Sequence, residues 1–193
     1  MGIPELTLER IVTVFGSSRP RETEPEYKTA YETGKELALS GFTICNGGYG
    51  GIMEASARGA KDAGGRTIGI IADIFPRQPN PWIDKAVTTK TLVDRMMALI
   101  ARGEAFVVLK GGTGTLLELA AVWEFMNKGI VNQRPIVVVG DFWNGVINTL
   151  KTELSWEGLE DCTKYVTLVK SPAACASFIR HQLTGTSDGN QKL

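Results

Sequence analysis

Two charged residues and three glycine-rich segments are the parts of this sequence that could do chemistry. Glu118 closely follows the segment KGGTGT at 110–115, and Arg95 lies in the helical pattern before it. A carboxylate can stabilise a growing positive charge or orient a water molecule, and a guanidinium can hold phosphate oxygens. Glycines let backbone amides approach an anion closely. These residue types together predict a site for a phosphate-bearing ligand.

Each glycine-rich segment ends a short apolar run and precedes a helical pattern, where a helix N-terminus favours negative charge. The spacing excludes two common nucleotide motifs, because G-x-x-x-x-G-K-[ST] is absent and Leu117 stands where G-x-G-x-x-G needs its third glycine. A nucleotide with one phosphate therefore suits these segments better than ATP or NAD. The candidate binding residues are Gly16, Ser17, Ser18, Gly47, Gly48, Gly51, Lys110, Gly111, Gly112, Thr113, Gly114 and Thr115.

Short apolar runs alternate with amphipathic patterns along the chain, which indicates a parallel sheet covered by helices on both faces. The sequence predicts strands at 10–15, 42–45, 67–71, 86–89, 105–109, 136–139 and 165–169. It predicts helices at 26–39, 52–63, 92–102, 116–128, 144–154 and 172–183. In such a doubly wound α/β fold, ligands bind beyond the carboxyl ends of the strands. The three glycine segments should therefore meet on one rim.

Length, composition and charge predict the domain organisation and disfavour several classes of function. We expect one domain at 1–183 and a disordered polar tail at 184–193. Basic and acidic residues number 21 each, so no global field attracts a nucleic acid polymer. The sequence has no run long enough to span a membrane and no signal-peptide pattern, which favours the cytoplasm. One histidine and three scattered cysteines predict no metal site, no disulfide scaffold and no histidine-based catalysis. We expect no cofactor.

The segment VVLKGGTGTLLE at 107–118 resembles the P-G-G-x-G-T-x-x-E signature of the LOG ("lonely guy") phosphoribohydrolases, long labelled lysine decarboxylases. FGSS at 15–18 and NGGYGGIMEASARGA at 46–60 are similar to that family's first two loops, and Arg95 lies in a segment like its arginine segment. The resemblance covers about residues 10–183. It implies a Rossmann-like fold and a homodimer, and it adds Met53 to the candidate binding residues.

The resemblance also implies hydrolysis of the N-glycosidic bond of a nucleoside 5′-monophosphate, which gives a free base and ribose 5-phosphate. Glu118 and Arg95 match the family's catalytic pair. Four positions depart from the family pattern: Lys110 replaces a proline, Thr113 an aromatic residue, Met96 a lysine and Leu117 a residue that is often acidic. The first three departures keep a second hypothesis open, a protein that binds or carries a nucleotide or a phosphorylated pterin such as molybdenum cofactor. A third hypothesis is an oligomeric scaffold protein whose glycine-rich rim no longer has a function of its own.

Structural alternatives also stay open for the charged residues. Thr115 and Glu118 have the spacing of a capping box, in which the glutamate reaches back to the N-cap amide. Arg95 could extend into solvent or pair with the neighbouring Asp94. Lys110 could either contact phosphate or extend into solvent. The hydrogen bonds of Glu118 decide between capping and chemistry.

Overall fold

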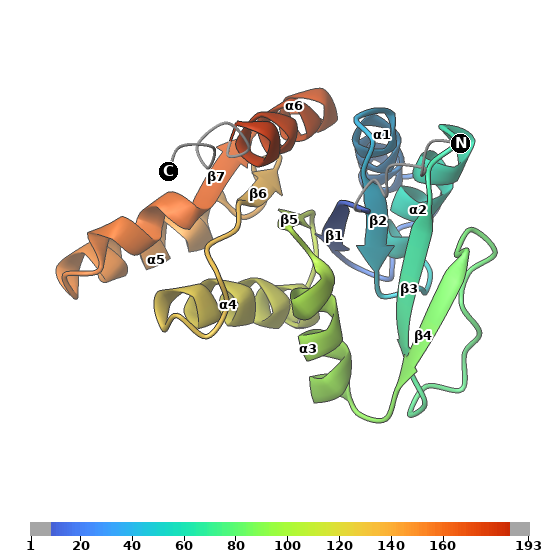
Figure 1. Ribbon diagram of the computed structural model, residues 1–193, viewed down its shortest axis with the longest axis horizontal. Helices are drawn as coiled ribbons and strands as arrows, with labels where there is room; N and C mark the ends of the chain where they lie inside the picture. Colours follow the sequence, from blue (N-terminus) through green and yellow to red (C-terminus); the bar gives the residue numbers. More distant parts are fainter. Residues whose placement is uncertain (1–8, 186–193) are drawn as a thin grey trace, which may run out of the picture.

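The computed structural model describes residues 9–185, which form a seven-stranded sheet in the order β4-β3-β2-β1-β5-β6-β7 (Figure 1). All six strand pairings are parallel. The α/β prediction is confirmed. The strands are β1 (Ile11–Phe15), β2 (Thr43–Asn46), β3 (Thr67–Ala72), β4 (Lys85–Thr89), β5 (Ala105–Val108), β6 (Ile136–Val139) and β7 (Val166–Val169).

Helices cover both faces of the sheet, with α1 and α6 at the top and α3 and α4 at the bottom of Figure 1. The helices are α1 (Pro25–Leu39), α2 (Ile52–Asp62), α3 (Leu92–Arg102), α4 (Thr113–Asn127), α5 (Asn144–Trp156) and α6 (Pro172–Thr184), with a 3₁₀ helix at Glu160–Tyr165. Residues of β5 alternate between the two cores. Val107 packs with α1, α2 and α6, whereas Phe106 and Val108 pack with α3, α4 and α5. This doubly wound packing is the one predicted from the strand–helix alternation.

Most element boundaries lie within two residues of the predictions, and three differences matter for the site and the domain bounds. Helix α4 begins at Thr113, not at 116, so half of the third glycine segment belongs to the helix. The 3₁₀ helix before β7 was not predicted, because its sequence EDCTKY has no apolar period. Helix α6 continues to Thr184, one residue past the predicted domain end. Residues 186–193 of the predicted tail lie outside the described residues, and a single domain at 1–183 stays a prediction.

The strand order reverses between β1 and β5, which makes this pair the topological switch point of the sheet. Val12 to Phe15 of β1 pair in register with Ala105 to Val108 of β5. Their carboxyl ends therefore deliver two glycine segments, 16–18 and 110–115, to neighbouring positions on one rim. The segment after β2 arrives beside them, because β2 pairs with the other side of β1.

Trp143 stabilises the chain immediately before the third glycine segment. Its indole N–H donates to the carbonyl oxygen of Leu109 at 3.0 Å, and the residue is 4% exposed. We expect Trp143→Phe to lower the free energy of unfolding by roughly 1–3 kcal/mol, because it leaves a buried carbonyl without its partner. Urea denaturation followed by circular dichroism measures this loss. Trp156→Phe is the matched control, since Trp156 is 81% exposed and its replacement should change stability by less than about 0.5 kcal/mol.

Candidate functional site

One residue, Ser17, joins all three glycine segments through its backbone. Its amide donates to the carbonyl oxygen of Lys110 at 3.1 Å, and its own carbonyl oxygen accepts from the Ile52 amide at 2.8 Å. The first segment thus bonds to the third segment on one side and to the first residue of α2 on the other. The predicted meeting of the segments on one rim is confirmed.

Two buried asparagines hold the second glycine segment. Asn46 Oδ1 accepts from the Gly48 amide at 2.8 Å, and its Nδ2 donates to the Met53 carbonyl oxygen at 2.8 Å. Asn80 Nδ2 donates to the carbonyl oxygens of Gly48 and Tyr49 at 3.1 and 2.9 Å. Satisfied buried polar groups of this kind favour one conformation of a loop. The segment is therefore a rigid wall of the rim.

The surroundings of the backbone favour glycine at two positions of this wall. A Cβ at Gly47 would collide with the guanidinium of Arg95. Gly51 has a φ of +69°, and a Cβ there would meet the backbone of Ser17 and Ser18. Gly47 thus lets the second segment pack closely against Arg95, and Gly51 lets it pack closely against the first segment.

The N-terminus of α4 presents unpaired amides to the rim. Gly112 is the N-cap without a side-chain cap, and Leu116 is the residue whose amide bonds back to Gly112. The amides of Thr113, Gly114 and Thr115 therefore lack intrahelical acceptors. The first turn has no acidic residue that would neutralise the positive end of the helix. This geometry suits a bound phosphate.

The capping box predicted for Thr115 and Glu118 is wrong. Thr115 lies inside the first turn of α4, is 4% exposed, and its side chain fills the space beside Gly111. Glu118 lies one turn further along, where it is too late in the helix to cap it. A Cβ at Gly111 would collide with the Thr115 side chain, so this glycine makes room for a helix that begins before Thr115. A side-chain N-cap is found instead on α3, where the Thr91 hydroxyl accepts from the Asp94 amide at 3.0 Å.

Arg95 is buried at the centre of the rim, with its side chain 13% exposed. Its Nε donates to the carbonyl oxygen of Ile70 in β3 at 2.7 Å, and its guanidinium carbon lies 5.6 Å from the Tyr49 ring centroid. Its terminal nitrogen reaches Met53 Sδ at 3.7 Å. Asp94 instead bonds the Thr91 hydroxyl, so the predicted alternative of an Asp94–Arg95 pair is wrong.

Glu118 faces Arg95 across the rim, with Oε1 3.7 Å from Nη1 and its side chain 16% exposed. Burial raises the pKa of Glu118 to about 7, because desolvation disfavours the carboxylate more than the Arg95 charge favours it. A carboxylate poised near neutrality can hold or release a proton under ordinary conditions. The two residues that the sequence singled out for chemistry are thus brought together.

Lys110 lies on the other side of the glycine segment. Its ammonium pairs with Glu26 in the first turn of α1 and lies 5.6 Å from the Phe142 ring centroid. The pKa of Glu26 is held below its usual range by the hydrogen bond from Lys110. The candidates Gly16 and Ser18 line the junction of the segments, where Gly16 packs against Ile52. Lys110 therefore does not contribute to the Glu118–Arg95 side of the rim in this state.

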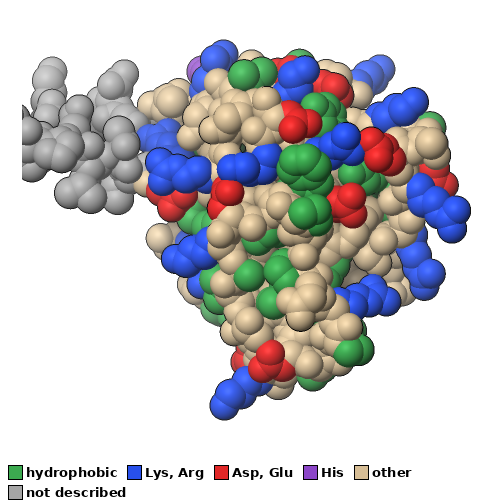
Figure 2. All heavy atoms as spheres, turned by 90° about the vertical axis from the view of Figure 1, so that its right-hand side faces the viewer, with side chains coloured by type: hydrophobic (Ala, Val, Ile, Leu, Met, Phe, Trp, Pro, Cys, Tyr) green, Lys and Arg blue, Asp and Glu red, His purple; other side chains and the backbone are tan. Residues whose placement is uncertain are grey.

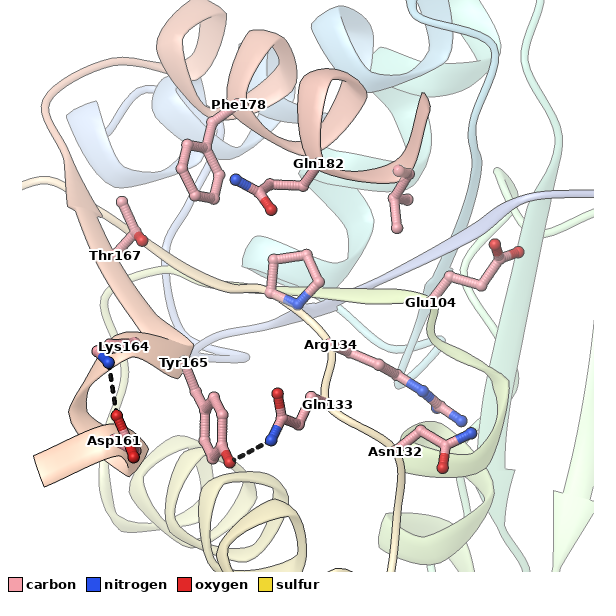
Figure 3. A pocket seen from close by; sticks show the side chains of 12 residues that line it. Glu104, Asn132, Gln133, Arg134, Asp161, Lys164, Tyr165, Thr167, Phe178 and Gln182 are labelled. Carbon is pink, nitrogen blue, oxygen red and sulfur yellow. Dashed lines mark hydrogen bonds and ion pairs between the residues drawn. The ribbon is translucent and has the colours of Figure 1, made fainter. Parts of the chain in front are cut away.

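A cavity of about 750 Å³ lies at the opposite edge of the sheet, before β5, β6 and β7 (Figure 3). Its charged groups already have protein partners. Arg134 donates to the carbonyl oxygens of Ile100 and Gly103, and Asp161 pairs with Lys164. In open parallel sheets, ligands bind beyond the carboxyl ends of the strands instead. We therefore assign the candidate site to the rim of glycine segments.

The surface and the remaining side chains offer few alternatives. On the face drawn in Figure 2, Lys and Arg side chains lie among Asp and Glu side chains across the coloured part of the molecule. Within residues 9–185, no group of three His, Cys, Asp or Glu side chains could hold a metal ion. No helix in the same range is long and apolar enough to cross a membrane.

Sequence reasoning missed the residues that support Arg95 and the second segment. Tyr49, under the guanidinium, lies inside NGGYGG, and its aromatic character in a glycine loop was a usable signal. Asn80 gave none, because an asparagine between two prolines is typical of any loop. Glu26 and Phe142, the neighbours of Lys110, lie 84 and 32 residues away in sequence, and no local pattern predicts such contacts.

A parallel α/β sheet with glycine loops and a Glu–Arg pair at one rim defines a Rossmann-like protein with a candidate site near its switch point. Residues 9–171 match the SLOG cluster4 family. The chain belongs to this family. The cytokinin riboside 5′-monophosphate phosphoribohydrolase of Mycobacterium tuberculosis is 33% identical over 178 residues, which cover 91% of this chain and 89% of that protein. The predicted resemblance to the LOG family is confirmed.

Solved structures with the same fold include molybdenum cofactor proteins. The molybdenum cofactor binding protein from Rippkaea orientalis superimposes with a TM-score of 0.71 at 27% identity, over 92% of this chain and 99% of that one. The molybdenum cofactor carrier protein from Chlamydomonas reinhardtii gives a TM-score of 0.74 at 23% identity over the same shares. At 23% identity, the similarity to the Chlamydomonas reinhardtii structure supports the fold alone.

The raised pKa of Glu118 predicts a pH-dependent effect of its replacement on stability. Between about pH 4.5 and 7 the folded protein keeps a proton that the unfolded chain releases, so stability falls as pH rises through this window. Glu118→Gln carries no charge and avoids this loss. We expect it to be more stable than the parent by roughly 1–3 kcal/mol at pH 8 and equal to it near pH 4.5.

Thermal or urea unfolding at several pH values measures the difference. Glu124→Gln is the control, since Glu124 lies on the same helix with its side chain 52% exposed, and its replacement should show no comparable trend. A Glu118→Gln variant that is less stable than the parent at pH 8 would mean that the ion pair with Arg95 outweighs desolvation.

Proposed function

We propose that the protein hydrolyses the N-glycosidic bond of a nucleoside 5′-monophosphate of the AMP or N6-substituted AMP type, giving a free base and ribose 5-phosphate. One observation carries the proposal: the buried pair Glu118–Arg95 lies next to the unpaired amides of the α4 N-terminus. Glu118 follows the first-turn residues by about 5–8 Å along the helix axis, at 1.5 Å per residue. A phosphate on the amides would leave the ribose beside the carboxylate.

The chemistry of this bond fits a carboxylate. As the C1′–N bond breaks, positive charge grows on the ribose, and a nearby carboxylate stabilises it. The oxygen of a water molecule bonds to C1′. One proton of that water passes to Glu118 and from there to the departing base, so that the carboxylate is regenerated. The Arg95 fork holds oxygens of the bound sugar phosphate and keeps Glu118 in place.

The proposal predicts how turnover responds to substitution and to pH. Incubation with AMP and N6-substituted AMPs, with ribose 5-phosphate as the readout, should show turnover that Glu118→Gln lowers by about 10²–10³-fold. For the parent, kcat/KM should rise with pH to a plateau above about pH 7, because the carboxylate is the active form. Arg95→Met should move this rise to higher pH, since the Arg95 charge lowers the pKa of Glu118.

Arg102→Met is the matched control for Arg95, because it lies on the same helix and bonds only within it, to Ala98. Arg102→Met should leave the pH at which kcat/KM rises unchanged. A profile with no rise near neutrality, or equal activity of Glu118→Gln and parent, would rule out the carboxylate role.

A second candidate function, a carrier of a phosphorylated pterin such as molybdenum cofactor, is favoured by the 27% identity to the Rippkaea orientalis protein. Met96 also favours the carrier function. It stands where the family resemblance implies a lysine, so a cation on the substrate side is missing. The same assay separates the two functions. Binding without release of ribose 5-phosphate at any pH supports the carrier. The compartment of either activity stays a prediction.

We propose in addition that the protein is a homodimer built on α3 and α4. These helices share a face of the sheet and expose apolar side chains next to the Arg95–Glu118 pair: Leu92 (50%), Val93 (63%), Met97 (38%) and Leu117 (59%). Exposed apolar groups gathered near one site are typical of an interface. The partner would close the rim against water.

Charged substitutions test this interface. Leu117→Asp should convert the dimer to a monomer in sedimentation velocity, because a buried carboxylate without a partner is strongly unfavourable. Leu39→Asp is the matched control, since Leu39 on α1 is 63% exposed and lies on the other face of the sheet. A parent protein that sediments as a monomer at micromolar concentration would contradict the proposal.

A further inference from the structure

A second, smaller cavity lies against the outer side of the third glycine segment. It has a volume of about 290 Å³ and is lined by Ser17, Arg19, Pro20, Glu24, Glu26, Lys110, Gly111 and Phe142. Because a water molecule takes about 30 Å³ in the liquid, the cavity has room for a tetrahedral anion with its hydration. It shares Gly111 with the segment that leads to the α4 amides.

The cavity and the Glu118–Arg95 pair lie on opposite sides of the sheet. Glu26 belongs to α1, whose residues pack in one core, whereas α3 and α4 pack in the other. The glycine segment runs between the two. A ligand whose phosphate sits on the segment's amides therefore has the ribose site on one side and this cavity on the other.

Two cationic side chains, Lys110 and Arg19, line the cavity, and only Lys110 is in an ion pair. Lys110 pairs with Glu26, with side chains 50% and 30% exposed. An exposed pair of this kind is weak and is readily exchanged for a stronger anion. Arg19 is exposed and makes no ion pair with any residue in the range 9–185. Of the two carboxylates, Glu24 is engaged by the backbone amide of Arg21 at 2.6 Å.

From this arrangement we infer that the cavity is a subsite for a second phosphoryl group, so that the protein binds nucleoside 5′-diphosphates more tightly than monophosphates. The inference rests on the proposed function for the placement of the first phosphate. The terminal phosphoryl group carries more negative charge than the Glu26 carboxylate, so Lys110 turns from Glu26 to the phosphate. Arg19 supplies a second, forked donor. Phe142, over which the ammonium lies, keeps the lysine stem at the cavity.

Calorimetric titration with AMP and ADP tests the subsite in a Glu118→Gln background, which suppresses turnover. We expect ADP to bind about tenfold more tightly than AMP, a difference that matches one added charge-assisted contact. Lys110→Met should remove this preference, because it should weaken ADP binding by about tenfold and AMP binding by less. Glu26→Gln, which frees Lys110, should increase it. Lys128→Met is the matched control, because Lys128 is an exposed lysine paired with Glu124 at the far end of α4.

The possible failures are distinguishable. Equal affinities for AMP and ADP, or a Lys110→Met variant that weakens both ligands alike, overturn the subsite and leave the proposed monophosphate site intact. Binding of neither ligand by correctly folded protein overturns the phosphate site itself, and the subsite with it. Circular dichroism spectra of each variant establish that folding is unchanged.

Discussion

The guanidinium of Arg95 is the contact on which the candidate site depends. It joins four elements at once: α3, which carries it, β3 through the Ile70 carbonyl, the second glycine segment through Tyr49, and α4 through Glu118. The absence of a side chain at Gly47 is what leaves room for it. A buried charge is stable only when its donors are used and a counter-charge is near. The Ile70 carbonyl, Tyr49 and Glu118 must therefore all lie around the Arg95 guanidinium, and this shared contact fixes the geometry of the rim.

The parallel sheet supplies the placement. Because β1 is flanked by β2 and β5, three glycine segments reach one rim from strands that lie far apart in the sequence, and the backbone of Ser17 ties them together. Helix α4 then begins within the third segment, which turns its first amides toward the same space. The proposed phosphate site and the Glu118 carboxylate thus belong to one helix and keep a fixed separation.

The sequence predicted much of this arrangement, and the limits of the prediction have physical causes. Strands and helices followed from periodicity, and Arg95 and Glu118 followed from a motif that the family shares. The start of α4 did not, because Thr-x-x-Glu is a stronger local signal than two glycines that let a helix begin earlier. The partners of Lys110 and the burial of Asn80 depend on contacts between distant segments, which leave no local pattern.

The two ion pairs of the rim contrast in a way that follows from their burial. Arg95 and Glu118 are 13% and 16% exposed, so moving either charge would leave the other in a poorly solvated place. Lys110 and Glu26 are 50% and 30% exposed, and water can replace either partner at little cost. The first pair therefore holds a fixed geometry, with the pKa of Glu118 raised by its surroundings. The second pair suits an exchangeable contact, and it lies where the chain departs from the proline of the LOG signature that it resembles. In the proposed function, a lysine at position 110 changes what the outer side of the loop binds and leaves the Glu118–Arg95 pair on its inner side undisturbed.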